Sequence, residues 1–128
     1  MALGTLFSFD MHRGDDRSIT FTVVDEAAAV VDITAATFIW IFAAQDAGSA
    51  SPQPRAGSTI LTKTESTGVV ITDAPNGAIR IDIDSADTVG LQAPKSYYHE
   101  VQITLAGKVT TIAFGNITLK REIAAPGP

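Results

Sequence analysis

Cysteine is absent from this chain of 128 residues, and histidine occurs only twice. Without cysteine, neither disulfide bonds nor thiolate metal sites can hold the fold together, so stability must come from apolar burial and backbone pairing. Because His12 and His99 are the only imidazoles, most acid–base and zinc chemistry would have to use one of them. We therefore expect a non-enzymatic protein with no catalytic residue, no metal site and no cofactor.

Basic residues are also few, with 9 lysines and arginines against 14 aspartates and glutamates, which gives a net charge of −5. Binding to nucleic acid or to anionic lipid normally uses a basic surface, so this balance argues against both partners. Long apolar runs are missing: the longest covers residues 38–44, whereas a membrane span needs roughly 18 residues. The N-terminus lacks the basic region of a secretory signal, so we expect the protein to be made and kept in the cytosol, or to be assembled there into something larger.

What the chain does have is alternation of apolar and polar residues. In residues 78–83 three isoleucines alternate with alanine, arginine and aspartate. A period of two places one set of side chains on each face of a β-strand, with one face buried and one solvated. At 45% hydrophobic and 18% charged residues, the chain is apolar enough to bury a core. We expect one domain over residues 1–128, with a flexible tail at residues 124–128.

The same pattern predicts an all-β fold, an antiparallel β-sandwich of the immunoglobulin-like or jelly-roll-like kind. A closed barrel shows the same alternation and stays an alternative. Residues 85–89 are expected to form one helical turn capped by Ser85. Residues 45–58, rich in Ala, Gly, Ser and Pro, are expected to form a long loop. Strands are expected over residues 6–13, 18–24, 30–33, 37–44, 59–66, 69–72, 77–83, 96–105, 108–114 and 116–123.

The expected strand over residues 37–44 is apolar on both faces. Phe38 and Trp40 lie on one face, and Ile39 and Ile41 on the other. Such a strand is either covered on both sides or faces a partner subunit.

The candidates for chemistry have simpler structural interpretations. His99 shares the alternation of Tyr97, which favours a packed imidazole with one hydrogen-bond partner. Asp82 and Asp84 lie on one face of a strand, a spacing that a cation or a glycosidase pair can use. A solvated outer face is favoured, because Arg80 shares that face and charged residues are mostly exposed.

Two short sequence matches are interpreted in the same way. Residues 13–15 spell Arg-Gly-Asp, the integrin-binding tripeptide, but a turn explains them better: the glycine permits it and the aspartate accepts backbone N–H groups. Residues 116–118 match the N-glycosylation sequence Asn-Ile-Thr, but they lie in an expected strand of a chain without a secretory signal. We therefore expect neither integrin binding nor a glycan.

The order of several segments resembles that of one known family. The segments are residues 9–16, 19–25, 31–34, 68–71, 77–81, 85–88 and 97–103. Together they resemble the β-sandwich domain at the N-terminus of tailed-phage baseplate upper and tail-fibre proteins, over nearly the whole chain. In proteins of that family the Arg-Gly-Asp-like turn is structural, which agrees with the interpretation above.

The resemblance implies a structural protein of a tailed-phage virion, assembled in the host cytoplasm, that binds other virion proteins and forms a homo-oligomer within the assembly. Attachment of tail, baseplate or fibre is the first expectation, and capsid decoration or cement is an alternative. Proteins of that family usually carry a stalk and a receptor-binding head after this domain. Because this chain ends at Pro128, we expect a small joining subunit. The expected partner contacts are Phe7, Gln45, Pro52, Pro54, Arg55, Tyr98 and Pro126.

A carbohydrate-binding β-sandwich is a further alternative, which requires exposed aromatic side chains. The candidates are Trp40, Tyr97 and Tyr98. Trp40 is expected in the core because Phe38 and Phe42 share its face. Tyr98 points away from the apolar face of its strand and is expected to be exposed.

Overall fold

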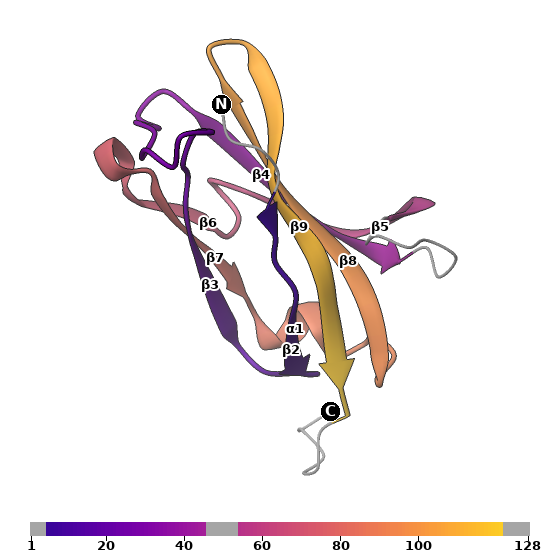
Figure 1. Ribbon diagram of the computed structural model, residues 1–128. Helices are drawn as coiled ribbons and strands as arrows, with labels where there is room; N and C mark the ends of the chain where they lie inside the picture. Colours follow the sequence, from indigo (N-terminus) through magenta and orange to yellow (C-terminus); the bar gives the residue numbers. More distant parts are fainter. Residues whose placement is uncertain (1–4, 46–53, 122–128) are drawn as a thin grey trace.

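In the computed structural model, which describes residues 5–45 and 54–121, two β-sheets lie face to face (Figure 1). The large sheet has the strand order β1/β2–β9–β8–β4–β5, and the small sheet has the order β3–β7–β6. Neighbouring strands are antiparallel, except that β1 and β2 run parallel to β9. This arrangement confirms the expected β-sandwich. The strands are β1 (Thr5–Leu6), β2 (Phe9–His12), β3 (Arg17–Thr22), β4 (Thr37–Gln45), β5 (Pro54–Thr64), β6 (Val69–Asp73), β7 (Ala78–Ile83), β8 (Lys95–Leu105) and β9 (Lys108–Lys120).

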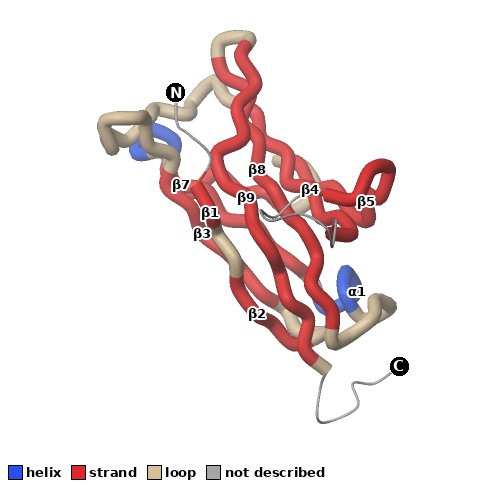
Figure 2. The backbone as a smooth tube through the Cα atoms, turned by 45° about the vertical axis from the view of Figure 1, so that its right-hand side comes forward, coloured by secondary structure: helices blue, strands red, loops and turns tan. Residues whose placement is uncertain are grey.

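Helical structure in the described ranges is confined to two short connections, the 3₁₀ helix η1 (Ala74–Asn76) and the helix α1 (Ser85–Thr88) (Figure 2). Neither is long and apolar enough to cross a membrane. Gly77 ends η1 with a φ of 72°, which is the positive φ that the Asn-Gly sequence predicts for this turn.

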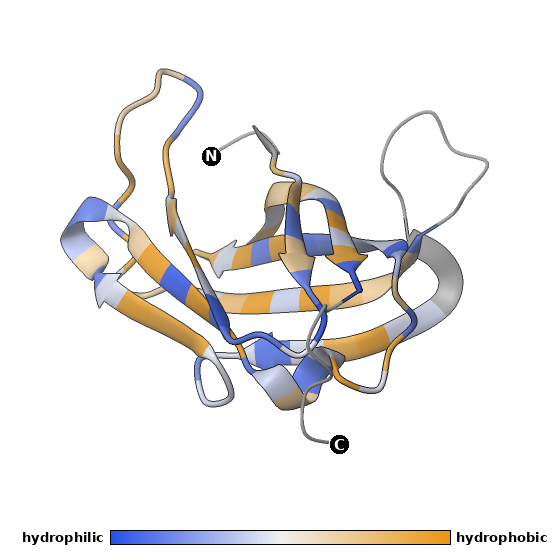
Figure 3. Ribbon diagram, turned by 90° about the horizontal axis from the view of Figure 1, so that it is seen from below, coloured by the Kyte–Doolittle hydropathy of each residue, from blue (hydrophilic) through white to orange (hydrophobic). Residues whose placement is uncertain are grey.

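The core lies between the sheets and is made by alternate residues of the strands. β4 contributes Phe38, Trp40 and Phe42, and β7 contributes Ile79 and Ile81, all at 3% exposure or less. Figure 3 shows the alternation as bands of opposite hydropathy along the strands. Each fully buried side chain of this size stabilises the fold by roughly 1.5–3 kcal/mol. Burial of the apolar side chains that recur at every second position is therefore the main source of stability.

The first expected strand, residues 6–13, is interrupted at Phe7 and Ser8, which separate β1 from β2. The Ser8 hydroxyl accepts the backbone N–H of Asn116 at 3.0 Å, where a continuous strand would offer a carbonyl. On the other side of this break β9 runs without interruption through Gly115, so the two strands expected at the C-terminal end are one. A Cβ atom at Gly115 would clash with the Phe7 carbonyl. The glycine permits close approach of two backbones and does not end a strand.

The loop expected at residues 45–58 is shorter at both ends. Gln45 is the last residue of β4 and pairs with Pro54, the first residue of β5, while residues 46–53 lie outside the described residues. β5 is the last strand of the large sheet, and an edge strand tolerates proline because one side of its backbone has no ladder to complete. The proline and glycine in this segment therefore do not prevent strand pairing.

The strand expected over residues 30–33 is reduced to a single bridge between Val24 and Val30. The Ile33 N–H donates to the carbonyl of Ala74 in η1 at 2.9 Å, and not to a neighbouring strand. A hydrogen bond to η1 thus stands where the sequence pattern predicted hydrogen bonds to a neighbouring strand.

A buried lysine ties α1 to the large sheet. Lys63 pairs with Trp40 across β5 and β4, is 4% exposed, and lies 2.9 Å from an oxygen of Asp87 and 3.8 Å from one of Asp84. The Asp87 carboxylate also accepts the Asp84 N–H at 2.7 Å. Asp84 is therefore the N-terminal cap of α1, and the expectation that Ser85 caps it is wrong. A carboxylate both caps this helix and pairs with the lysine, so the two functions share one group.

Replacement of Lys63 tests this connection. Lys63→Met keeps the aliphatic length but leaves Asp87, whose side chain is 15% exposed, without its cation. We expect the free energy of unfolding, measured by urea denaturation, to fall by about 2 kcal/mol. In the double variant Lys63→Met/Asp87→Asn the amide still accepts the Asp84 N–H without a charge, so more than half of the loss should be recovered. Equal losses in the single and double variants would contradict the ion-pair account.

Strain in the β8–β9 turn gives a second prediction. Ala106 has a φ of 54° and precedes Gly107 at 78°, so both central residues of this hairpin turn have positive φ. The left-handed conformation costs an L-residue roughly 1–2 kcal/mol, and glycine avoids most of this cost. Ala106→Gly should raise the free energy of unfolding by about 0.5 kcal/mol. The control Ala86→Gly, within α1, should lower it, and destabilisation by both variants would show that the turn is not strained.

Candidate functional site

His99 is fully buried and connects three segments of the chain. Its Nδ1 accepts the indole N–H of Trp40 at 3.2 Å, and its Nε2 lies 2.7 Å from the Phe7 carbonyl. Because an indole N–H can only donate, Nδ1 carries no proton, and Nε2–H donates to Phe7. Burial lowers the pKa of the imidazole, against the opposing effect of the Phe7 hydrogen bond. The expected packed imidazole is confirmed, with two partners instead of one, and both ring nitrogens are occupied.

A polar groove of about 410 Å³ lies along β3 and β7, where Asp82 and Arg80 pair. Asp82 accepts the Nε–H of Arg80 at 2.9 Å and the hydroxyl of Ser18 at 2.8 Å. Both hydrogen bonds lower the pKa of Asp82, and the bond from Arg80 has the larger effect on it. Asp82 therefore lies on the surface, as expected, and the structure adds its ion pair with Arg80. Within residues 5–45 and 54–121, no group of three or more His, Asp or Glu side chains is placed to hold a metal ion.

The Arg-Gly-Asp turn is attached to the segment that follows β7. The Arg13 guanidinium donates to a backbone carbonyl at 2.9 Å, and the Gly14 N–H donates to the Thr88 hydroxyl at 2.9 Å. Gly14 has a φ of 84°, a conformation that glycine adopts without strain. Asp15 is expected to accept a backbone N–H, but Asp16 does so instead, from Ser85 at the start of α1. The turn thus has the structural role that was predicted, with a different acceptor.

Tyr98 is not the exposed aromatic that the alternation predicts. It is 5% exposed, and its hydroxyl donates to Glu100 at 2.9 Å. Burial raises the pKa of the Tyr98 hydroxyl above its ordinary value, and the neighbouring carboxylate adds to the rise. Its strand is central, with β4 on one side and β9 on the other, so side chains of both neighbours flank the ring. Since Trp40 and Tyr97 are also buried, at 1% and 3% exposure, none of the three aromatics proposed for sugar stacking presents an open face.

The other residues expected to contact partners lie in different places. Gln45 is half-buried at the end of β4, and its Oε1 has no hydrogen-bond partner among the described residues. Pro54 and Arg55 lie in β5, whereas Pro52 and Pro126 lie outside the described residues. These residues therefore do not form one described surface.

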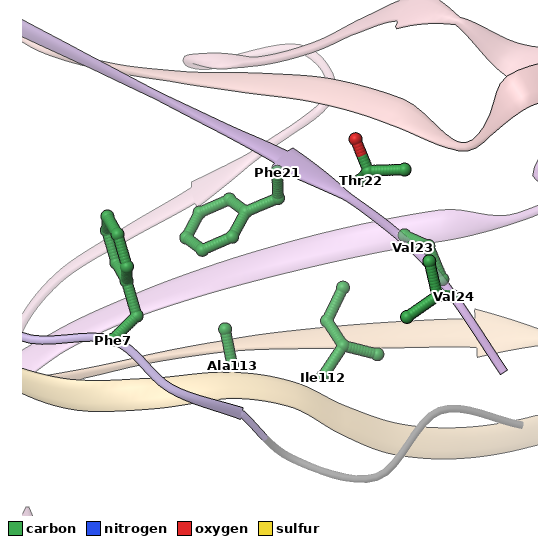
Figure 4. A pocket seen from close by; sticks show the side chains of 7 residues that line it. All are labelled: Phe7, Phe21, Thr22, Val23, Val24, Ile112 and Ala113. Carbon is green, nitrogen blue, oxygen red and sulfur yellow. The ribbon is translucent and has the colours of Figure 1, made fainter. Parts of the chain in front are cut away.

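Phe7, the remaining member of that set, lies on the wall of an apolar pocket of about 110 Å³ (Figure 4). Its ring is 5.1 Å from the ring of Phe21 in an edge-to-face arrangement. The pocket lies between the end of β3 on the small sheet and β9 on the large sheet, a region that sequence reasoning missed because no local pattern reports a gap between sheets. Its apolar lining consists of Phe7, Phe21, Val23, Val24, Ile112 and Ala113.

The outer face of the large sheet keeps apolar side chains that the small sheet does not cover. Ile39 and Ile41 of β4 are only half-buried, on the opposite side from the core residues of that strand. Phe114 of β9 is also half-buried and pairs with Glu100, which in turn pairs with Ile41. These three apolar side chains lie on one face of the sheet, which we call the outer apolar face. The two-faced pattern of β4 thus reflects a central strand with one covered and one open side.

Comparison with known proteins assigns no family to the chain. No protein-family model matches it, and no curated protein matches it.

The buried imidazole predicts a pH dependence of stability. A group whose folded pKa lies below its unfolded value, 6.5 for this histidine, takes up a proton more readily in the unfolded chain. The contribution of His99 is therefore complete above about pH 6.5 and is lost as the pH falls below that value. We expect the free energy of unfolding, measured from pH 8 to pH 5, to fall less steeply in His99→Gln than in the unmodified protein. An unchanged slope in a folded His99→Gln variant would refute the assignment to His99.

Proposed function

We propose that the chain is a non-enzymatic structural protein of a tailed-phage virion that works through protein–protein contacts. Attachment of tail, baseplate or fibre is the preferred role. The proposal begins with the order of segments that resembles the N-terminal domain of baseplate upper and tail-fibre proteins. The strands formed by these segments here lie in one β-sandwich, which is compatible with that resemblance.

The outer apolar face is the observation that carries the contact role. Ile39 and Ile41 remain half-buried on a sheet face that the small sheet leaves open. Glu100 lies between Ile41 and Phe114 on this face, so a partner would meet half-buried apolar side chains beside a carboxylate, a mixed surface of the kind that protein interfaces use. Other virion proteins, or further copies of this chain within an assembly, are the partners that fit the proposed role.

The test is to look for the chain in particles of the phage or prophage that encodes it. Mass spectrometry and immunogold labelling of purified particles should find the chain in a constant ratio to the major structural proteins, at the tail. Ile41→Lys places a charge on the outer apolar face and should lower the copy number by about tenfold, the factor that corresponds to 1.4 kcal/mol of contact energy.

Thr72→Lys is the matched control, because Thr72 is exposed on β6 of the small sheet. This variant should enter particles normally, and circular dichroism should show that both variants fold. Absence of the chain from purified particles would overturn the proposal. Labelling of the capsid surface would replace the tail role with capsid decoration.

A further inference from the structure

At one edge of the small sheet, backbone N–H and C=O groups of β3 pair with no other strand in the described part of the chain. The Val23 N–H donates to the Gly77 carbonyl and the Asp25 N–H to the Ala29 carbonyl, both at 2.8 Å. Since backbone groups of successive residues in a strand point to opposite sides, those of Thr20 and Val24 point away from β7. β3 is the outermost strand of its sheet, so no described strand pairs with them.

This edge is more regular than the other described edges. The pairing of β3 with β7 runs without a register shift from Arg17 to Thr22. By contrast, β5 has two register shifts against β4, β6 has one against β7, and the first edge strand of the large sheet is broken at Phe7 and Ser8. Bulges and interruptions protect an edge from pairing with another chain, and β3 has neither.

The free length of the β3 edge is its second half. At its start the Arg17 guanidinium donates to the Asp10 carbonyl at 3.3 Å and lies 4.9 Å from the centre of the Phe9 ring, so β2 occupies that end. Figures 1 and 2 show β3 and the N-terminal strands at the same side of the sandwich. A strand added to residues 20–24 would therefore run beside the apolar pocket.

The pocket supplies what an added strand needs besides backbone bonds. A strand paired with β3 would point alternate side chains into the space between the sheets, where Phe7, Phe21 and Ala113 line the pocket (Figure 4). At about 110 Å³ the pocket has room for one aliphatic side chain. In strand addition, main-chain bonds supply affinity and such pockets supply specificity.

Charge at one end of this edge favours one kind of occupant. Asp25 and Glu26 follow the free half of β3, whereas Asp15 and Asp16 before the strand lie between Arg13 and Arg17 in the sequence. Like charges repel and opposite charges steer association, so an acidic segment is disfavoured and a basic one favoured.

We propose that the free edge at residues 20–24, which is the second half of β3 and the two residues after it, binds an extended segment of a partner protein together with the apolar pocket. The segment has an aliphatic side chain that enters the pocket and basic residues beside it. This inference rests on the proposed function for its biological setting, because it names a surface through which the assembly contacts are made.

The probe is a synthetic peptide in which valine and leucine alternate with threonine, with lysines at both ends. Its control has the same composition, with the aliphatic residues placed next to one another. Titrated into the ¹⁵N-labelled protein, the alternating peptide should shift the amide resonances of Thr20, Thr22 and Ala113 and bind at least about tenfold more tightly than the control, a factor that corresponds to 1.4 kcal/mol.

Two variants separate the edge from the pocket. Thr20→Pro removes an edge N–H that β7 does not use, and Thr20→Val keeps that N–H at the same position, so only the proline should weaken binding, by about tenfold. Ala113→Leu fills the pocket without changing β3 and should also weaken binding. Thermal unfolding shows that each variant is folded.

The outcomes decide the proposal. Absence of shifts with either peptide, equal binding of both peptides, or unchanged binding to folded Thr20→Pro would overturn it. A concentration-dependent dimer that Thr20→Pro abolishes would assign the edge to a second copy of the chain and overturn the proposal of a basic partner segment. If the chain is found in particles but Thr20→Pro enters them normally, this inference fails while the proposed function stands. If the peptide binds but particles lack the chain, the proposed function fails while the binding of an extended segment at this edge stands.

Discussion

The buried imidazole of His99 holds the N-terminal segment against the large sheet, and much of the rest depends on that attachment. β1 and β2 are short, pair on one side only, and are separated by Phe7 and Ser8. At this break the His99 Nε2–H donates to the Phe7 carbonyl, while the Trp40 indole fixes the position of the proton on the ring. The same contact positions the Phe7 ring, which forms one wall of the apolar pocket. His99 thus helps to organise the N-terminal edge of the sandwich.

The sequence predicted what depends on local alternation. The strand over residues 78–83 and the packed position of His99 follow from a period of two, and both are confirmed. The apolar pattern on both faces of β4 predicted a strand that is covered on both sides or faces a partner subunit; its outer side is only half-buried, and a partner there stays a prediction. What the sequence could not predict depends on pairing between distant segments. Gly115 was interpreted as a break because no local pattern shows that the Phe7 backbone crosses there. Tyr98 was expected in solvent because alternation gives the face of a strand but not how closely its neighbours flank it.

The proposed function takes its setting, a tailed-phage virion, from the resemblance alone, and two surfaces of the structure are proposed for contacts between proteins. The outer apolar face and the free edge of β3 belong to different sheets, so one molecule can contact two neighbours at once.

The most direct test of the central claim is to add the purified chain to particles produced by a phage deleted for it, and to measure binding by sedimentation. A structural subunit should bind these particles to saturation at a fixed copy number, and should not bind particles that already contain it. Failure to bind deleted particles, or binding that rises without saturation and equally on both kinds of particle, would contradict a role in the virion.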